Sequence, residues 1–175
     1  MKNANSARSD KIVKNFLARK PHCKRKVQVF EKAFNASPST VFDQLCPSRE
    51  TDWINGWDVD LLYTKTGYAE PLCLFRTTVS NIFGSGLWMI TRLEPSTILE
   101  LVVFQEDSDI VEYTKIHIID NGNGTCKGVW EITLTATSEK GNSLIDSVPD
   151  DEPAFLAELE YFLNMAMTSL QWRQA

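Results

Sequence analysis

The chain ends in the pattern of one long helix, and the hundred residues before it are almost entirely strand and turn. From Asp151 to Arg173, apolar residues recur at helical spacing. Asp150 and Asp151 can cap the start of this helix, and Pro153 suits its first turn. Its 23 residues at ~1.5 Å each give a rod of ~34 Å, long enough to cross a curved sheet. The chain is therefore expected to fold a sheet around one terminal helix.

The apolar surface of this helix is wider than that of an ordinary surface helix, because two neighbouring stripes are apolar. We therefore expect the helix to be gripped by the sheet, with most of these side chains in the core. One stripe holds Phe155, Leu159, Phe162, Ala166 and Ser169, and the other holds Leu156, Leu163, Met167 and Leu170.

Short segments of alternating polarity, separated by turn residues, predict six or seven antiparallel strands. The clearest alternation runs from Gly128 to Thr137, and the strongest hairpin turn is Asn121–Gly124. Gly84 and Gly86 are expected to bracket a loop. The predicted strands are 26–34, 59–63, 72–79, 87–93, 98–104, 110–119 and 128–137.

Two short helical segments are predicted after the first strand. Ser37 followed by Pro38 caps a helix that Pro47 ends, and a second helical turn covers 48–53. Near the other end of the chain, the polar segment 139–142 is expected to turn the chain toward the terminal helix.

Length and composition fit one domain with a substantial core, since 43% of the 175 residues are apolar. No apolar run approaches the ~20 residues that span a membrane, and no secretory signal is evident, so a cytoplasmic location is expected. Cys23, Cys46, Cys73 and Cys126 lie far apart and are expected to be reduced thiols. Neither a metal site nor a cofactor motif is expected from the sequence.

Charge divides the chain into a basic arm and an acidic body. Residues 1–26 contain nine Lys or Arg and one acid, whereas the remainder contains nine Lys or Arg and 22 acids. Residues 1–25 are therefore predicted to form an arm, partly helical or disordered, before a domain over 26–175. A basic amphipathic helix can bind an anionic membrane or nucleic acid. For this arm, docking on the acidic body or self-association with a second copy is favoured, and no nucleic-acid partner is expected.

Several segments between residues 26 and 172 combine with this order of elements to suggest a family. They are Asn35–Phe42, Cys46–Glu50, Asp52-Trp53, Gly56-Trp57, Leu74–Arg76, Trp88–Thr91 and Thr133–Thr137 ahead of Gly141-Asn142. Together they resemble the START-like (SRPBCC) helix-grip superfamily, in its polyketide cyclase/dehydrase branch. The resemblance implies an α+β helix-grip fold, in which a curved antiparallel sheet wraps around the C-terminal helix.

The resemblance also implies a hydrophobic cavity between sheet and helix, with an opening near the two short helices. Members of this superfamily bind lipids, sterols or polyketides there, and some transform the ligand. The superfamily shares no catalytic triad, so no residue here inherits a role.

The candidate ligand-binding residues are large and apolar. Trp53 and Trp57, four residues apart near the expected opening, can stack on a flat or apolar ligand, or else close the end of the core. Trp88 lies in a strand, where a core role is the alternative. The full set of candidates is Trp53, Trp57, Tyr63, Phe75, Trp88, Leu159 and Phe162.

Catalytic candidates are few. His117 would be the best general acid or base if it faced inward, and Glu131 would be its partner. Glu112 and Glu131 would be polar groups in the cavity if they were buried beside Arg76 or Arg92, and solvated charges on the outer face otherwise.

Three functions are open at this point. A binding or carrier protein for an apolar ligand needs only a cavity, whereas a cyclase or dehydratase needs a buried acid or base. An interaction protein resembling a chaperone cofactor would have a filled cavity and act through its surface.

Overall fold

The protein folds as seven strands and four helical segments over the residues that the computed structural model describes, 22–81 and 84–171. Side chains are described for 22–77 and 85–165. In chain order the elements are β1 (Arg25–Phe34), α2 (Pro38–Gln44), the 3-10 turn η1 (Glu50–Asp52), β2 (Val59–Tyr63), β3 (Leu74–Asn81), β4 (Gly84–Glu94), β5 (Ile98–Gln105), β6 (Ile110–Asp120), β7 (Cys126–Ala136), α3 (Glu139–Ser147) and α4 (Ala154–Gln171).

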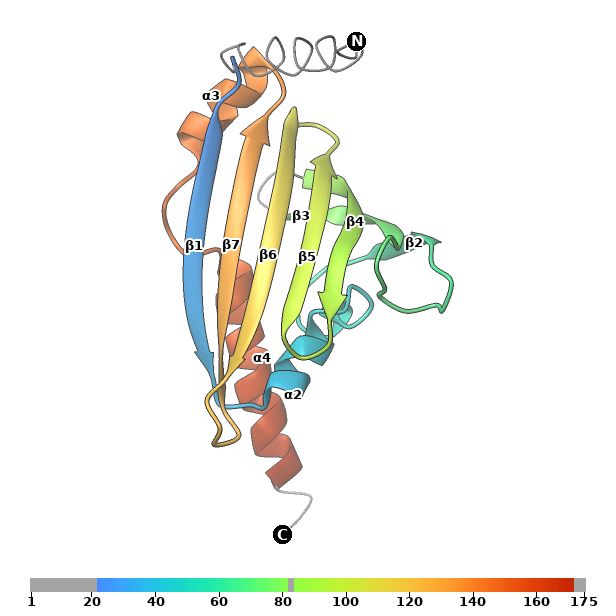
Figure 1. Cartoon of the computed structure of the whole chain (residues 1–175), viewed down its shortest axis with the longest axis vertical. Coiled ribbons are helices and arrows are strands. Elements are labelled where there is room, and N and C mark those ends of the chain that lie inside the picture. The colour runs from blue at the N-terminus through green and yellow to red at the C-terminus, as the bar shows by residue number, and fades with distance from the viewer. Residues whose placement is uncertain (1–21, 82–83, 172–175) are drawn as a thin grey trace, which may run out of the picture.

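All seven strands belong to one antiparallel sheet in the order β1-β7-β6-β5-β4-β3-β2. From β2 to β7 each strand pairs with the next along the chain, and β1 pairs with β7 at the far edge. The sheet curves across one side of the molecule, and α4 lies behind it (Figure 1). The α+β helix-grip architecture predicted from the sequence is confirmed.

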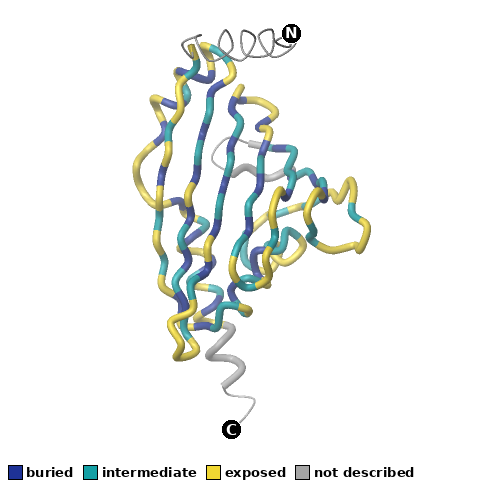
Figure 2. The backbone as a smooth tube through the Cα atoms, in the orientation of Figure 1, coloured by how far each residue is buried: buried dark blue, intermediate teal, exposed yellow. Residues whose placement is uncertain are grey.

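The inner face of the sheet is defined by strict alternation along its central strands. Every second residue of β7 from Cys126 to Ala136 is buried, and Trp130 and Leu134 are almost fully so. Buried and less buried residues also alternate along β5 and β6 (Figure 2). The period of two arises because successive side chains of a strand point to opposite faces.

Helix α4 packs on the sheet through a single leucine stripe. Leu156, Leu159 and Leu163 are buried, while Tyr161 is 68% exposed on the opposite side. Phe155 and Phe162, from the predicted stripe that also contains Leu159, are only partly buried. The helix is thus covered on one side over 154–165, and the side chains of Ala166, Met167, Ser169 and Leu170, like residues Trp172 and Arg173, lie outside the described part.

A basic residue of β1 connects the first strand to the last helix. The ammonium group of Lys32 lies 3.1 Å from Glu152 and 2.9 Å from Glu160, before and within α4. The side chain of Lys32 is largely shielded from water, so this pair of contacts is screened less than the ion pairs on the open surface. It fixes the start of α4 against the edge of the sheet.

Helix α2 forms as its sequence predicts. Thr40 N donates to Ser37 Oγ at 3.2 Å, and Pro38 occupies the first turn, where its missing N–H is not needed. The predicted second helical turn is η1. Helix α2 lies beside α4, near the lower ends of the strands (Figure 1).

Two sequence predictions about glycine-containing segments are wrong. The expected turn at 139–142 is the first half of helix α3, in which Gly141 lies so close to the β5–β6 turn that a Cβ atom would stand 2.4 Å from Asp109 O. Gly84 and Gly86 belong to strand β4 rather than to a loop before it. A Cβ on Gly86 would meet Val103 at 2.7 Å, so glycine permits close packing there.

The described chain begins with residues that are attached to the domain. Lys24 N donates to Asn142 Oδ1 at 2.7 Å, and Asn142 Nδ2 donates to His22 O at 3.1 Å. Residues 1–21 lie outside the described residues, so the basic arm over 1–25 stays a prediction. All four cysteines are free thiols, with Cys73 and Cys126 buried.

Candidate functional site

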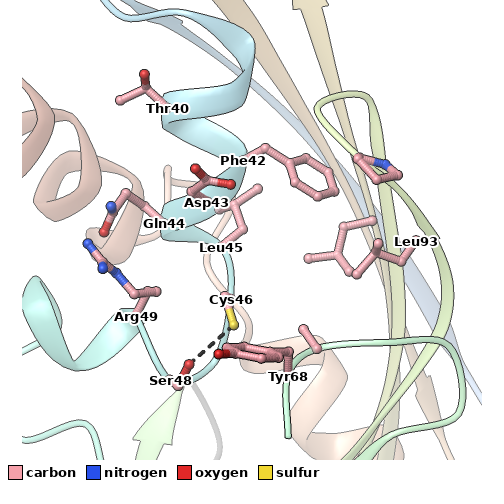
Figure 3. Close-up of a pocket in the computed structure, with 13 residues that line it drawn as sticks. Thr40, Phe42, Asp43, Gln44, Leu45, Cys46, Ser48, Arg49, Tyr68 and Leu93 are labelled. Carbon is pink, nitrogen blue, oxygen red and sulfur yellow. Dashed lines mark hydrogen bonds between the residues drawn. The ribbon is translucent and has the colours of Figure 1, made fainter. Parts of the chain in front are cut away.

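Two hollows lie on either side of the segment that contains α2 and η1, and Leu45 lines both. The first has a volume of about 530 Å³ and lies between α2, the loop at Tyr68 and the β4–β5 turn. Phe42 and Leu93 face each other across it, and Tyr68 lies beside Cys46 (Figure 3). Tyr68 is 73% exposed, and Asp43 and Arg49 are also exposed, so this hollow is open to water.

The second hollow, here called the inner cavity, lies between the sheet, the η1 segment and the start of α4. Its volume is about 420 Å³. The inner faces of β5, β6 and β7 form its floor, as the superfamily resemblance predicts. It is lined by Leu45, Glu50, Trp53, Ile54, Asn55, Trp57, Trp88, Leu101, Glu112, Thr114, Ile116, Trp130, Ile132, Pro153, Ala154, Phe155 and Glu158.

Four tryptophans line the inner cavity, and three of them are held by hydrogen bonds to the protein. The indole N–H of Trp53 donates to Gln44 O at 3.0 Å, and that of Trp57 to Pro47 O at 2.8 Å. The indole N–H of Trp88 donates to Thr77 Oγ1 at 2.9 Å. Because their donors are already used, these rings present aromatic surface to the cavity rather than N–H groups.

A buried carboxyl group lies in the floor of the inner cavity. Glu112 on β6 is 9% exposed and accepts hydrogen bonds from Thr114 Oγ1 at 2.8 Å and Gln105 Nε2 at 3.2 Å. Burial raises the pKa of Glu112, and these two hydrogen bonds oppose the rise. Arg76 pairs with Glu106, and Arg92 pairs with Glu94 and Glu100, so neither arginine is the partner that the sequence suggested for Glu112.

A second carboxyl group enters the inner cavity from η1. Burial raises the pKa of Glu50 to about 8 from its ordinary value of 4.5. Glu50 is not among the site residues predicted from the sequence, because a three-residue 3-10 turn has no periodicity that assigns its side chains to a face.

Three of the seven predicted ligand-binding residues line the inner cavity, namely Trp53, Trp57 and Trp88. Phe75 lies behind Trp88, stacked at 5.6 Å between ring centroids, and is only 1% exposed. Leu159 is fully buried in the core, and Phe162 packs against that core. Neither of these two α4 residues lines either hollow.

The remaining predicted residues lie elsewhere. Tyr63, on the edge strand β2, is 54% exposed and lines neither hollow. His117 and Glu131 are exposed on the outer face of the sheet, which their strand positions dictate because Ile116 and Trp130 face inward. Because His117 does not face inward, it cannot act as a general acid or base in the cavity.

The described residues contain no group of three or more His, Cys, Asp and Glu side chains arranged to hold a metal ion. Among their helices, none combines the length and the apolar character that crossing a membrane requires.

Comparison with known proteins identifies the fold. No protein-family model and no curated protein matches this chain. Solved structures do: norcoclaurine synthase from Thalictrum flavum, in a point-mutant complex with a transition-state analogue, aligns with a TM-score of 0.63 at 12% identity over 85% of this chain and 99% of that one. The chain has the helix-grip fold, as its sequence resemblance predicts.

Two other helix-grip structures align over similar lengths. The Zhui aromatase/cyclase from Streptomyces sp. R1128 has a TM-score of 0.60 at 12% identity, over 84% of this chain and 96% of that one. Ara h 8.0201 has a TM-score of 0.58 at 12% identity, over 81% of this chain and 99% of that one. At this level of identity the similarity concerns the fold, and the site must be judged from its own residues.

Proposed function

We propose that the protein binds or carries a mainly apolar small molecule in the inner cavity, between the sheet and α4. The observation that carries this proposal is a cavity of about 420 Å³ whose walls are mostly aliphatic and aromatic. Ligand sites of proteins are commonly apolar hollows of about 300–1,000 Å³ with a few polar groups. The helix-grip structures that are named for a synthase and an aromatase/cyclase support a small-molecule site in this fold.

Apolar burial alone would give only weak binding. A ligand that hides about 300 Å² of apolar surface gains roughly 7 kcal/mol at ~25 cal/mol per Å². Association costs at least about 4 kcal/mol, which leaves a net affinity near the millimolar range. The polar groups of the cavity must therefore supply selectivity and the rest of the affinity.

Native mass spectrometry of freshly purified protein is the first test, because a retained small molecule would identify the ligand class directly. Isothermal titration with fatty acids, sterols and aromatic polyketides is the second. We expect at least one class to bind. If no compound binds and none is retained, the interaction-protein function becomes the better explanation.

A matched pair of variants locates the binding site. Leu101 and Val102 are neighbours on β5, but only Leu101 lines the inner cavity, while Val102 lies on the outer face. Leu101→Phe should fill part of the cavity and weaken binding about tenfold or more, because extra volume in a packed site is poorly accommodated. Val102→Phe should bind as the wild type does. Equal binding by both variants would place the ligand elsewhere.

A cyclase or dehydratase activity is the second candidate, and Glu50 is the observation that favours it. A carboxyl with a pKa of about 8 is largely protonated at neutral pH and can donate a proton to a ligand in an apolar site. Product analysis of each bound compound, with wild type and Glu50→Gln compared, separates an enzyme from a carrier.

A further inference from the structure

The charged side chains of the inner cavity are all acidic. Glu50 reaches it from η1, Glu112 from β6 and Glu158 from α4. None of the described lining residues is Lys, Arg or His. Three elements that are far apart in the sequence thus bring carboxyl groups to one hollow and no positive charge to balance them.

Within the described part of the chain, these three carboxyls also have no positive partner outside the cavity. None of the ion pairs found among the described residues involves Glu50, Glu112 or Glu158. Among the side chains that the structure describes, Glu112 is hydrogen-bonded to the neutral Thr114 and Gln105. Glu158 is exposed to water, so the electrostatic preference for a cation depends mainly on Glu50 and Glu112, which are shielded from it.

The aromatic walls favour the same kind of ligand. Trp53, Trp57 and Trp88 use their indole N–H groups within the protein, so they do not offer these donors to an anion. The faces of aromatic rings attract cations and repel anions because of their quadrupole. Aromatic walls combined with unpaired carboxyls are suited to an apolar molecule that carries a protonated amine.

We propose that the inner cavity selects hydrophobic organic cations: amines whose ammonium group pairs with Glu50 and Glu112 while their apolar body lies against the tryptophans. This inference rests on the proposed function, which it narrows from apolar molecules in general to one charge class. Carboxylate ligands such as fatty acids are disfavoured, because none of the described lining residues is a Lys, Arg or His that could pair with their charge.

Proton release gives the binding a characteristic pH dependence. In the empty cavity burial favours the protonated form of Glu50, whose pKa is about 8, and it also raises the pKa of Glu112. Glu158 at the start of α4 is the other titratable group that lines the cavity. A bound ammonium favours the ionised carboxyl, so below about pH 8 binding releases a proton. The affinity should then rise with pH, by at most tenfold per pH unit for each proton released.

The experiment compares ligands that share one body and differ in charge. Two matched series are titrated calorimetrically: naphthalenemethylamine, naphthalenemethanol and naphthoate, and then decylamine, decanol and decanoate. We expect the amine of at least one series to bind about tenfold to a hundredfold more tightly than its alcohol, as a charge-assisted hydrogen bond allows. The carboxylate should bind most weakly.

Variants assign the preference to the proposed residues. Glu50→Gln with Glu112→Gln keeps the shapes of both side chains and should reduce the preference for amine over alcohol to about threefold or less. Glu131→Gln, on the outer face of β7, is the control and should keep the wild-type preference. The amine affinity of the wild type should also rise between about pH 6 and pH 8, whereas the alcohol affinity should not.

The outcomes distinguish the two proposals. If amine and alcohol bind equally, or if the carboxylate binds best, the cation proposal is overturned while binding of an apolar molecule stands. If amine preference survives in the double variant, the carboxyls named here do not cause it, and the proposal fails. If no member of either series binds and no other apolar compound does, both proposals fall together.

Discussion

The stability of the protein should depend on pH through Glu50. Burial raises the pKa of this carboxyl from 4.5 to about 8, so the folded state holds a proton that the unfolded state has lost over this range. The contribution of Glu50 to the free energy of unfolding is therefore highest below about pH 4.5. It decreases as the pH rises to 8, by at most ~1.4 kcal/mol per pH unit. Glu50→Gln, which cannot ionise, should lack this loss.

The size of the effect follows from the same two pKa values. Between pH 5 and pH 8 the full shift would cost the wild type between about 3 and 4 kcal/mol relative to Glu50→Gln. Glu50 is partly exposed as a residue, so movement of its side chain toward water relieves some of the cost, and we expect about 2 kcal/mol.

Urea unfolding at several pH values measures this difference. The free energy of unfolding of the wild type minus that of Glu50→Gln should fall steadily between pH 5 and pH 8. Glu131→Gln, on the exposed outer face, should show no such trend. A wild-type-to-variant difference that stays constant within about 0.5 kcal/mol would mean that the Glu50 carboxyl is solvated, and the argument from burial would be refuted.

Three further predictions concern the helices and the N-terminal residues. Leu159→Asp places a charge at a fully buried site and should lower the free energy of unfolding by about 4 kcal/mol. Tyr161→Asp, on the exposed side of α4, should change it by less than about 1 kcal/mol. Similar urea midpoints for the two variants would contradict the packing of α4. Gly141→Ala should destabilise the folded protein by about 1–3 kcal/mol despite the better helix propensity of alanine, because the Cβ would meet Asp109 O at 2.4 Å. A variant more stable than the wild type in the same assay would show that this contact relaxes freely. Deleting residues 1–21 should leave the circular dichroism and urea midpoint unchanged and should alter any self-association in a salt-dependent way, while a truncated chain that fails to fold would assign the segment to the core.

The sequence was a good guide to the elements because strands and caps have local causes. Seven strands, the Ser37 cap and the hairpin at Asn121–Gly124 all follow from patterns within a few residues. Helix α3 is not predicted from the sequence, because Gly141 is a poor helix former by itself. Its glycine allows close packing against Asp109 in the β5–β6 turn, over 30 residues earlier in the chain. Local propensity cannot register such a contact, so the segment looked like a turn.

The faces of the strands were harder to assign than the strands themselves. Along β6 the inner set is Ile110, Glu112, Thr114, Ile116 and Ile118, with His117 in the opposite set. Glu112 and Thr114 are the polar residues of this inner set, and the others are isoleucines. Polar side chains are disfavoured in a filled core, so their presence on the inner face is the sequence pattern that indicates a cavity. Glu50 gave no comparable signal, since its position depends on how η1 packs against the sheet and α4.

The hydrogen bonds of Trp53 and Trp57 have a consequence for how tightly a ligand can be held. The indole of Trp53 donates to the carbonyl of Gln44 at the end of α2, and that of Trp57 donates to the carbonyl of Pro47 in the turn that follows. Hydrogen bonds within this segment therefore hold both rings in place. A wall whose side chains are already held by hydrogen bonds loses little conformational freedom when a molecule enters. Differences in affinity among ligands of this cavity should then arise mainly from the contacts that each ligand makes. The entropy cost of ordering a loop around the ligand should contribute little.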